Sequence, residues 1–132
     1  MAKPLIHAEQ TARKRGGVPE DYLEIHDFMD SSKSVFSDNR HRALTHNSWF
    51  IFVVERVFGH TIKNSGGMNV SVRDICEQHI LEDFGGKYIP TAADYLEGME
   101  FQPWMNNGMK GMPSSQRRIN HNTKKRTVMQ FD

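Results

Sequence analysis

Histidine is the residue type in this 132-residue chain that most suggests chemistry. The sequence holds seven histidines but a single cysteine, Cys76, which excludes both a disulfide framework and a cysteine-based zinc cage. Imidazole is the commonest neutral metal ligand in proteins, and carboxylates complete such sites where cysteine is absent. The candidate ligands are therefore histidines that stand near acids.

Two histidine and acid pairs have the spacing of one helical turn. His26 precedes Asp30 by four residues, and His79 precedes Asp83 by the same number. Side chains four residues apart lie on the same face of a helix. Two helices that each present such a pair can converge on one ion inside a helical core. The spacing predicts a site for a divalent transition metal, which would be zinc, iron or manganese.

Two further histidines, His41 and His46, lie between these pairs in the sequence. On an ideal helix they would be about 140° apart, so they can share a site only if the helix begins or bends between them. The ordinary role of a helical histidine is a surface group or a hydrogen-bonding group in the core. We assign that ordinary role to His7 and His121, and we interpret His60 as a cap for the carbonyls of the helix that ends before it. The role stays open for the others.

A metal with an open coordination position would support hydrolysis. It would lower the pKa of a bound water, which could then attack a phosphoester. Glu82 is the candidate general base, and Arg40 and Arg42 are candidates for holding an anionic substrate. The alternative is a metal or polar network that only holds a small helical domain together.

The elements that must position these residues are mostly helical. Glycine and proline divide the chain into short segments, and apolar residues recur at helical spacing between them. Residues 61–63 and 68–70 flank an Asn-Ser-Gly-Gly turn, which predicts a small hairpin. The prediction is a mainly α domain with one short hairpin and extended basic termini. We expect helices over residues 4–15, 19–30, 43–58, 72–84 and 92–99, and a short turn at 103–106.

Charge divides the chain into three parts. Residues 1–18 carry four bases and one acid, residues 19–109 carry seven bases and fourteen acids, and residues 110–132 carry six bases and one acid. We therefore predict a basic N-terminal arm or helix, a helical core domain and a basic C-terminal tail with these boundaries.

The basic tail supports a second class of function. It has few apolar residues, so it would become ordered only against an anionic partner such as nucleic acid or a neighbouring subunit. The chain would then be a non-enzymatic assembly component, for example a virion protein. The bases that would bind this partner are Lys110, Arg117, Arg118, Lys124, Lys125 and Arg126.

No membrane association is expected. The longest apolar stretch, residues 49–54, is far shorter than a bilayer span, and the first ten residues lack the apolar core of a signal peptide. The expected location is the cytoplasm of a host cell or a phage particle, and the sequence indicates no particular oligomeric state.

Three segments, residues 39–51, 70–75 and 77–96, resemble a small uncharacterised family found in phages and bacteria. The resemblance extends from Gly16 to about Asn107 and implies no activity.

A shorter segment, His41-Arg-Ala-Leu-Thr-His46, is similar to the His-Arg-Gly-x-Thr-His motif of membrane-associated metal-dependent hydrolases, with Ala43 in place of the glycine. In those proteins an Asp-rich segment precedes the motif, as Asp27 and Asp30 do here. The likeness implies hydrolysis and a metal set of Asp27, Asp30, His41 and His46.

Overall fold

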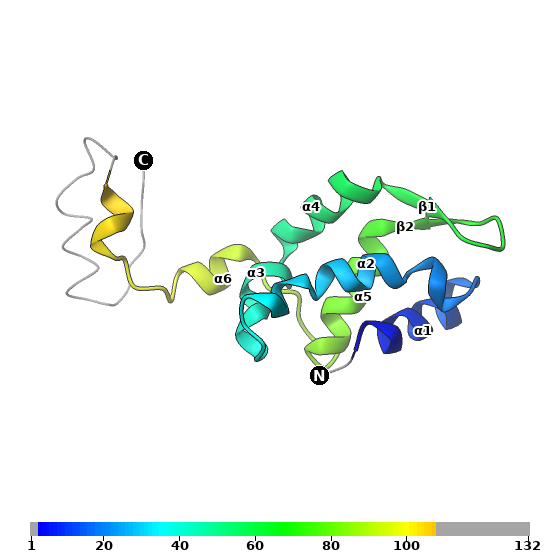
Figure 1. Ribbon diagram of the computed structural model, residues 1–132, viewed down its shortest axis with the longest axis horizontal. Coiled ribbons are helices and arrows are strands. Elements are labelled where there is room, and N and C mark those ends of the chain that lie inside the picture. Colours follow the sequence, from blue (N-terminus) through cyan, green and yellow to red (C-terminus); the bar gives the residue numbers. More distant parts are fainter. Residues whose placement is uncertain (1–2, 108–132) are drawn as a thin grey trace. The chain divides into compact units, whose positions relative to one another are not determined.

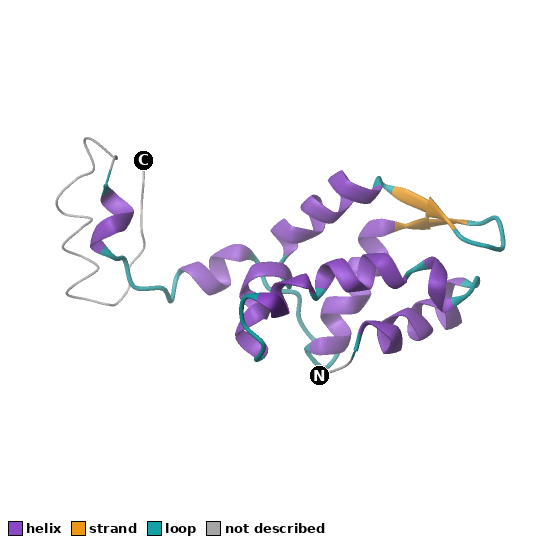
Figure 2. Cartoon of the chain, viewed as in Figure 1, coloured by secondary structure: helices purple, strands orange, loops and turns teal. Residues whose placement is uncertain are grey.

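The computed structural model describes residues 3–107. Helices dominate it, and two short strands form an antiparallel hairpin (Figure 2). The fold class predicted from the sequence is confirmed. The elements are α1 (Pro4–Arg15), α2 (Leu23–Met29), α3 (Arg42–Thr45), α4 (Ser48–Phe58), β1 (Thr61–Lys63), β2 (Asn69–Ser71), α5 (Val72–Asp83) and α6 (Ala92–Leu96), with 3-10 turns at Pro19–Asp21, Ser31–Ser34, Asn39–His41 and Pro103–Asn106.

Helix α5 is the element around which the others pack. It contacts α1, α2 and α4, and α2 in turn lies against both α1 and α4 (Figure 1). The chain divides into two compact units after residue 92, and α1 to α5 with the hairpin belong to the first. The boundaries predicted at residues 18 and 110 stay a prediction, but the basic residues of α1 belong to a helix that packs on the core.

The apolar core lies where α4, α5 and the hairpin meet α2. Its members include Ile25, Val54, Val72 and Ile80, each at most 2% exposed. Cys76 is buried in the same cluster, and burial raises the pKa of its thiol to about 12. In the part of the chain that the structure describes, no helix has the length and apolar character needed to cross a membrane.

The hairpin has the predicted position, and a buried asparagine anchors it. Thr61 pairs with Ser71, and Lys63 pairs with Asn69. The side-chain oxygen of Asn64 accepts hydrogen bonds from the main-chain nitrogens of the turn, and its amide nitrogen donates to the hydroxyl of Tyr22. The turn is thereby tied to the segment that precedes α2.

Two predicted helices are each divided by a break. The first opens as a 3-10 turn and becomes α-helical only after Tyr22, whose buried ring places its hydroxyl 2.7 Å from the main-chain oxygen of Gly16. The second stops at Thr45 and restarts at Ser48, because Asn47 caps α4 by accepting from the main-chain nitrogen of Phe50 at 2.8 Å. This second break releases His46 from helical geometry.

Replacing this cap should destabilise the domain measurably. Asn47→Ala removes the acceptor for Phe50 and the amide that donates to the main-chain oxygen of Ala43, and the side chain is only 2% exposed. We expect the free energy of unfolding to fall by about 1–2 kcal/mol. Urea unfolding measures the change, and Asn69→Ala at the exposed end of β2 is the matched control. An equal loss in both variants would contradict the role of the cap.

Candidate metal centre

Three elements bring two histidines and two acids together inside the first unit. Asp30 follows the last residue of α2, and His46 follows the last residue of α3. His79 and Asp83 are one turn apart at the end of α5. Each of these residues offers one ligand atom, and all four atoms lie within 4.8 Å of one another. The structure therefore contains a histidine and acid cluster that could hold a metal ion.

The distances between the ligand atoms define the shape of the site. His46 Nε2 lies 2.8 Å from Asp83 Oδ2 and 3.7 Å from Asp30 Oδ1. His79 Nε2 lies 3.2 Å from Asp30 Oδ1 and 3.5 Å from Asp83 Oδ2. In a tetrahedral zinc site, bonds of about 2.0–2.2 Å place neighbouring ligand atoms about 3.3–3.6 Å apart. The four distances scatter around that value, so the residues fit a tetrahedral cation.

The donor atoms are protected from solvent. Both histidine side chains are fully buried, and those of Asp30 and Asp83 are 4% and 2% exposed. Two carboxylates this close repel each other in a medium of low dielectric, so the pair needs positive charge nearby. The chemistry of the donor set, two imidazoles and two carboxylates, suits a divalent transition metal.

Each carboxylate directs its second oxygen to a cationic side chain. Asp30 Oδ2 lies 3.4 Å from Lys33 Nζ, and Asp83 Oδ1 lies 3.3 Å from His7 Nε2 and 3.9 Å from Arg42 Nη2. Burial by itself would raise the pKa of both acids. Hydrogen bonds from the histidines, together with the nearby positive charges, outweigh burial and lower both pKa values below the ordinary range. Both acids are ionised at neutral pH.

The outer nitrogen of His79 has a polar partner. Its Nδ1 lies 2.8 Å from His26 Nδ1, and His26 Nε2 lies 2.8 Å from the hydroxyl of Thr11 on α1. Burial lowers the pKa of His26 to about 2 and that of His79 to about 4, so both imidazoles are neutral at pH 7. A neutral imidazole held through its outer nitrogen is the usual state of a metal ligand.

The outer nitrogen of His46 is held by a second chain of polar groups. Its Nδ1 lies 3.0 Å from the hydroxyl of Thr45, which lies 2.9 Å from that of Ser32, and Ser32 reaches His41 Nδ1 at 2.8 Å. Helix α3 begins at Arg42, between His41 and His46, which meets the condition for the two histidines to lie together. Their rings meet edge to face with centroids 5.3 Å apart. The structure places His41 beside the ligands and outside the group of four.

Sequence reasoning assigned an ordinary role to His7, but the structure places it against the cluster. Its ring is fully buried and stacks on that of His79 with centroids 3.8 Å apart. Its Nδ1 lies 2.7 Å from Glu82 Oε1, whereas its Nε2 is buried without a hydrogen bond of acceptable geometry, 3.3 Å from Asp83. Burial opposes protonation, but the two carboxylates outweigh it and raise the pKa of His7. The available signal was that His7 and Thr11 share one face of a helix.

The other predicted site residues lie at different distances from the cluster. Glu82 contacts His7 and Gln78, and Arg42 approaches Asp83 and lies over the ring of Phe84. Arg40 is exposed and paired with Asp38 at 2.8 Å.

Asp27, which the hydrolase motif implied as a ligand, is exposed and outside the group of four. The six tail bases proposed for partner binding, Lys110, Arg117, Arg118, Lys124, Lys125 and Arg126, lie outside the described residues.

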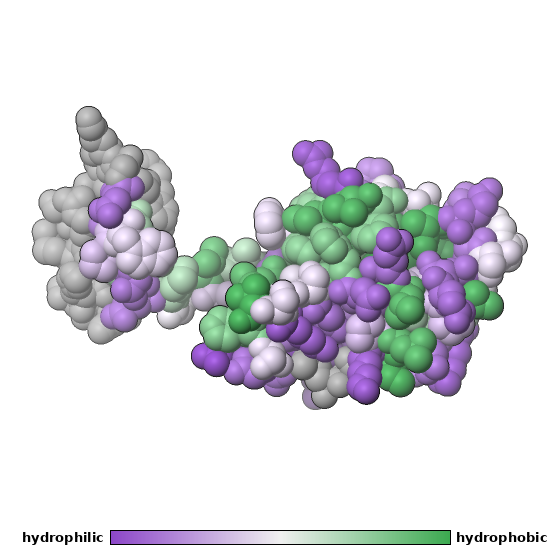
Figure 3. All heavy atoms as spheres, viewed as in Figure 1, coloured by the Kyte–Doolittle hydropathy of each residue, from purple (hydrophilic) through white to green (hydrophobic). Residues whose placement is uncertain are grey.

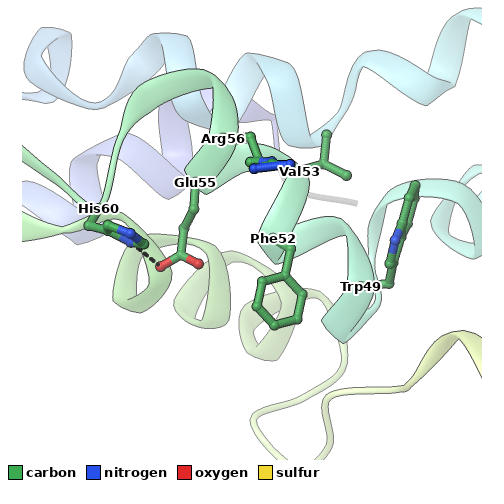
Figure 4. A pocket seen from close by; sticks show the side chains of 6 residues that line it. All are labelled: Trp49, Phe52, Val53, Glu55, Arg56 and His60. Carbon is green, nitrogen blue, oxygen red and sulfur yellow. Dashed lines mark hydrogen bonds and ion pairs between the residues drawn. The ribbon is translucent and has the colours of Figure 1, made fainter.

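Two surface pockets are lined by other residues. One runs along α4 beside Trp49 and Phe52, where Glu55 lies next to His60 (Figure 4). The other lies between α2 and α4 and includes Asp27. Apolar residues gather over α4 in Figure 3, and Trp49 and Phe52 are 58% and 57% exposed. Neither pocket opens onto the four candidate ligands.

Residues 2–105 match the family described as "Domain of unknown function (DUF6915)". The chain belongs to the DUF6915 family. The matched DUF6915 region contains all four candidate ligands and the residues of α1 that support them, while neither its membership nor its description assigns an activity. No curated protein and no solved structure matches the chain.

Proposed function

We propose that this DUF6915 domain binds one divalent transition metal ion through Asp30 Oδ1, His46 Nε2, His79 Nε2 and Asp83 Oδ2, and that the ion holds α2, α3 and α5 together. The observation that carries the proposal is the set of four histidine-to-carboxylate distances, 2.8–3.7 Å, among four buried ligand atoms that all lie within 4.8 Å of one another. Zinc is the first candidate because it favours tetrahedral nitrogen and oxygen ligands, and iron and manganese are alternatives.

A structural role is favoured over a catalytic one. Four protein ligands complete a tetrahedron, and a hydrolytic zinc centre typically keeps one position for water. When bound, the ion would supply positive charge between two buried carboxylates and cross-link helices that are far apart in sequence. Metal-dependent hydrolysis of phosphoesters, with Glu82 as base and Arg40 and Arg42 on the substrate, stays a prediction.

The assembly function also stays a prediction. It rests on the basic residues after position 109, and the contacts of α1 neither support nor oppose it. The two proposals are compatible, because a metal that stabilises the helical core leaves the charged tail available for a partner.

Metal analysis of the purified full chain tests the metal proposal. We expect about one zinc, iron or manganese ion per chain, and His46→Asn should lower the affinity at least about tenfold because it removes a ligand nitrogen. His60→Asn is the matched control, since the His60 side chain is 88% exposed. Absence of bound metal after reconstitution with excess zinc, or equal affinity in both variants, would refute the proposal.

A further inference from the structure

A chain of hydrogen bonds leads from the surface to His79. Some groups in it can only accept hydrogen bonds, and these groups determine which atom donates at each step. It begins at Glu82, whose carboxylate oxygens accept hydrogen bonds. Gln78 Nε2 lies 2.9 Å from Glu82 Oε2, so the amide nitrogen must be the atom that faces the acid. The amide oxygen of Gln78 is thereby turned toward Thr11, 3.1 Å from its hydroxyl.

The orientation of the Thr11 hydroxyl determines which atom donates in its hydrogen bond with His26. Its hydroxyl faces two carbonyl oxygens, the amide oxygen of Gln78 and the main-chain oxygen of His7 at 3.0 Å, and neither can donate. The hydroxyl proton is therefore directed to these oxygens. The hydroxyl oxygen must then accept from His26 Nε2, which lies 2.8 Å away.

His26 determines which nitrogen of His79 carries the proton. A neutral imidazole has one N–H, and in His26 that N–H is on Nε2, so its Nδ1 accepts. His79 Nδ1, 2.8 Å away, must donate. The Nε2 of His79 is then left with a lone pair for the metal, with Asp30 Oδ1 and Asp83 Oδ2 only 3.2 and 3.5 Å from it. Without the metal, the contact with Asp30 is a hydrogen bond that needs a proton on Nε2. A lone pair facing two carboxylate oxygens is repulsive unless a cation lies between them.

We infer that this relay fixes His79 in the Nδ1–H tautomer and so aims the Nε2 lone pair at the metal position; its positioning residues are Glu82, Gln78, Thr11 and His26. The inference rests on the proposed metal site. It adds that a residue of α1, Thr11, determines the tautomer of His79 on α5. It also gives Glu82 a role that differs from the general base expected from the sequence.

The relay can be broken with little change in side-chain volume. Thr11→Val removes the acceptor of His26 Nε2, so the His26 proton can move to Nδ1 and the His79 proton to Nε2, where it blocks the metal. We expect Co²⁺ affinity to fall about 10–100-fold, as for other outer-shell changes. Thr11→Ser restores the hydroxyl and should bring the affinity to within about threefold of the original protein. Equal affinity in all three proteins would overturn the relay.

A spectroscopic measurement tests the relay without a variant. Long-range ¹H–¹⁵N spectra of the imidazoles in the zinc-loaded full chain should report the Nδ1–H tautomer for His79 and the Nε2–H tautomer for His26. The Nδ1–H tautomer at His26 would overturn the relay even though zinc is bound. A chain that takes up no zinc would refute the proposed function instead.

Discussion

Removal of the bound metal is expected to lower the free energy of unfolding by about 4 kcal/mol when the free metal had been near a thousand times its dissociation constant. The reason is that the four ligand atoms converge only in the folded chain, since they come from positions as distant as residues 30 and 83. Loss of the ion also leaves two buried carboxylates facing each other. For a chain of this size the unfolding temperature should fall by on the order of 10 °C.

Thermal unfolding with and without a chelator provides the measurement. Asp83→Asn supplies the matched control, because it removes charge and an oxygen ligand while it keeps the volume of the side chain. Its unfolding temperature should be lower than that of the original protein and insensitive to the chelator. Identical unfolding of the original protein before and after complete metal removal would show that the site does not stabilise the fold.

Acid should destabilise the metal-free protein steeply between pH 6.5 and 4. The pKa of His26 is about 2 and that of His79 about 4, whereas the unfolded imidazole has a pKa near 6.5. Across this interval the unfolded chain takes up two protons that the folded chain does not. Stability therefore falls as pH falls, by up to about 1.4 kcal/mol per pH unit for each histidine. The slope should approach about 3 kcal/mol per pH unit.

Other titrating groups do not reverse the sign of the slope of stability against pH between pH 6.5 and 4. His7 has a raised pKa, so its stabilising contribution is complete below pH 6.5 and is lost as pH rises through its folded value. The pKa values of Asp30 and Asp83 are lowered, so their contributions disappear at still lower pH.

Urea unfolding in chelator at several pH values measures the slope. His26→Gln should reduce it by about 1.4 kcal/mol per pH unit, and His60→Asn should leave it unchanged. A stability that is flat between pH 6.5 and 4 would mean that these imidazoles are protonated inside the fold.

The helices and the hairpin could be predicted because their signals are local. The proline at the start of α1, the serine cap of α5 and the glycines between the strands act through their own backbone or that of near neighbours. The break at Tyr22 could not be predicted in the same way. It depends on a phenol that reaches back to Gly16 and across to Asn64, and both contacts require the tertiary fold.

The histidine and acid pairs were informative in unequal degree. His79 and Asp83 lie on one continuous helix, so their spacing puts both on the face that reaches the cluster. His26 and Asp30 have the same spacing, but α2 ends at Met29. Asp30 therefore reaches the ligand group while His26 contacts it only through His79. A sequence pattern gives the face of a helix but not the residue at which the helix stops.

The sequence showed the contribution of α1 to the site only as a shared helix face, and it did not show the contacts of that face. Basic residues near its end, Arg13, Lys14 and Arg15, suggested a basic arm or helix, and they are exposed. The opposite face carries His7 and Thr11, whose partners Glu82 and Gln78 lie about seventy residues away. Pairings at such separation leave no local signature in one sequence.

The burial of Cys76 separates this centre from the redox chemistry of thiols. Many metal sites in proteins hold their ion through thiolates, which oxidants consume and reductants regenerate. Here the only sulfhydryl of the chain is sealed among aliphatic side chains with its pKa raised to about 12, and the candidate donors are nitrogen and oxygen. An oxidant in the surroundings would therefore find no thiolate ligand to oxidise, and it could not release the ion by that route.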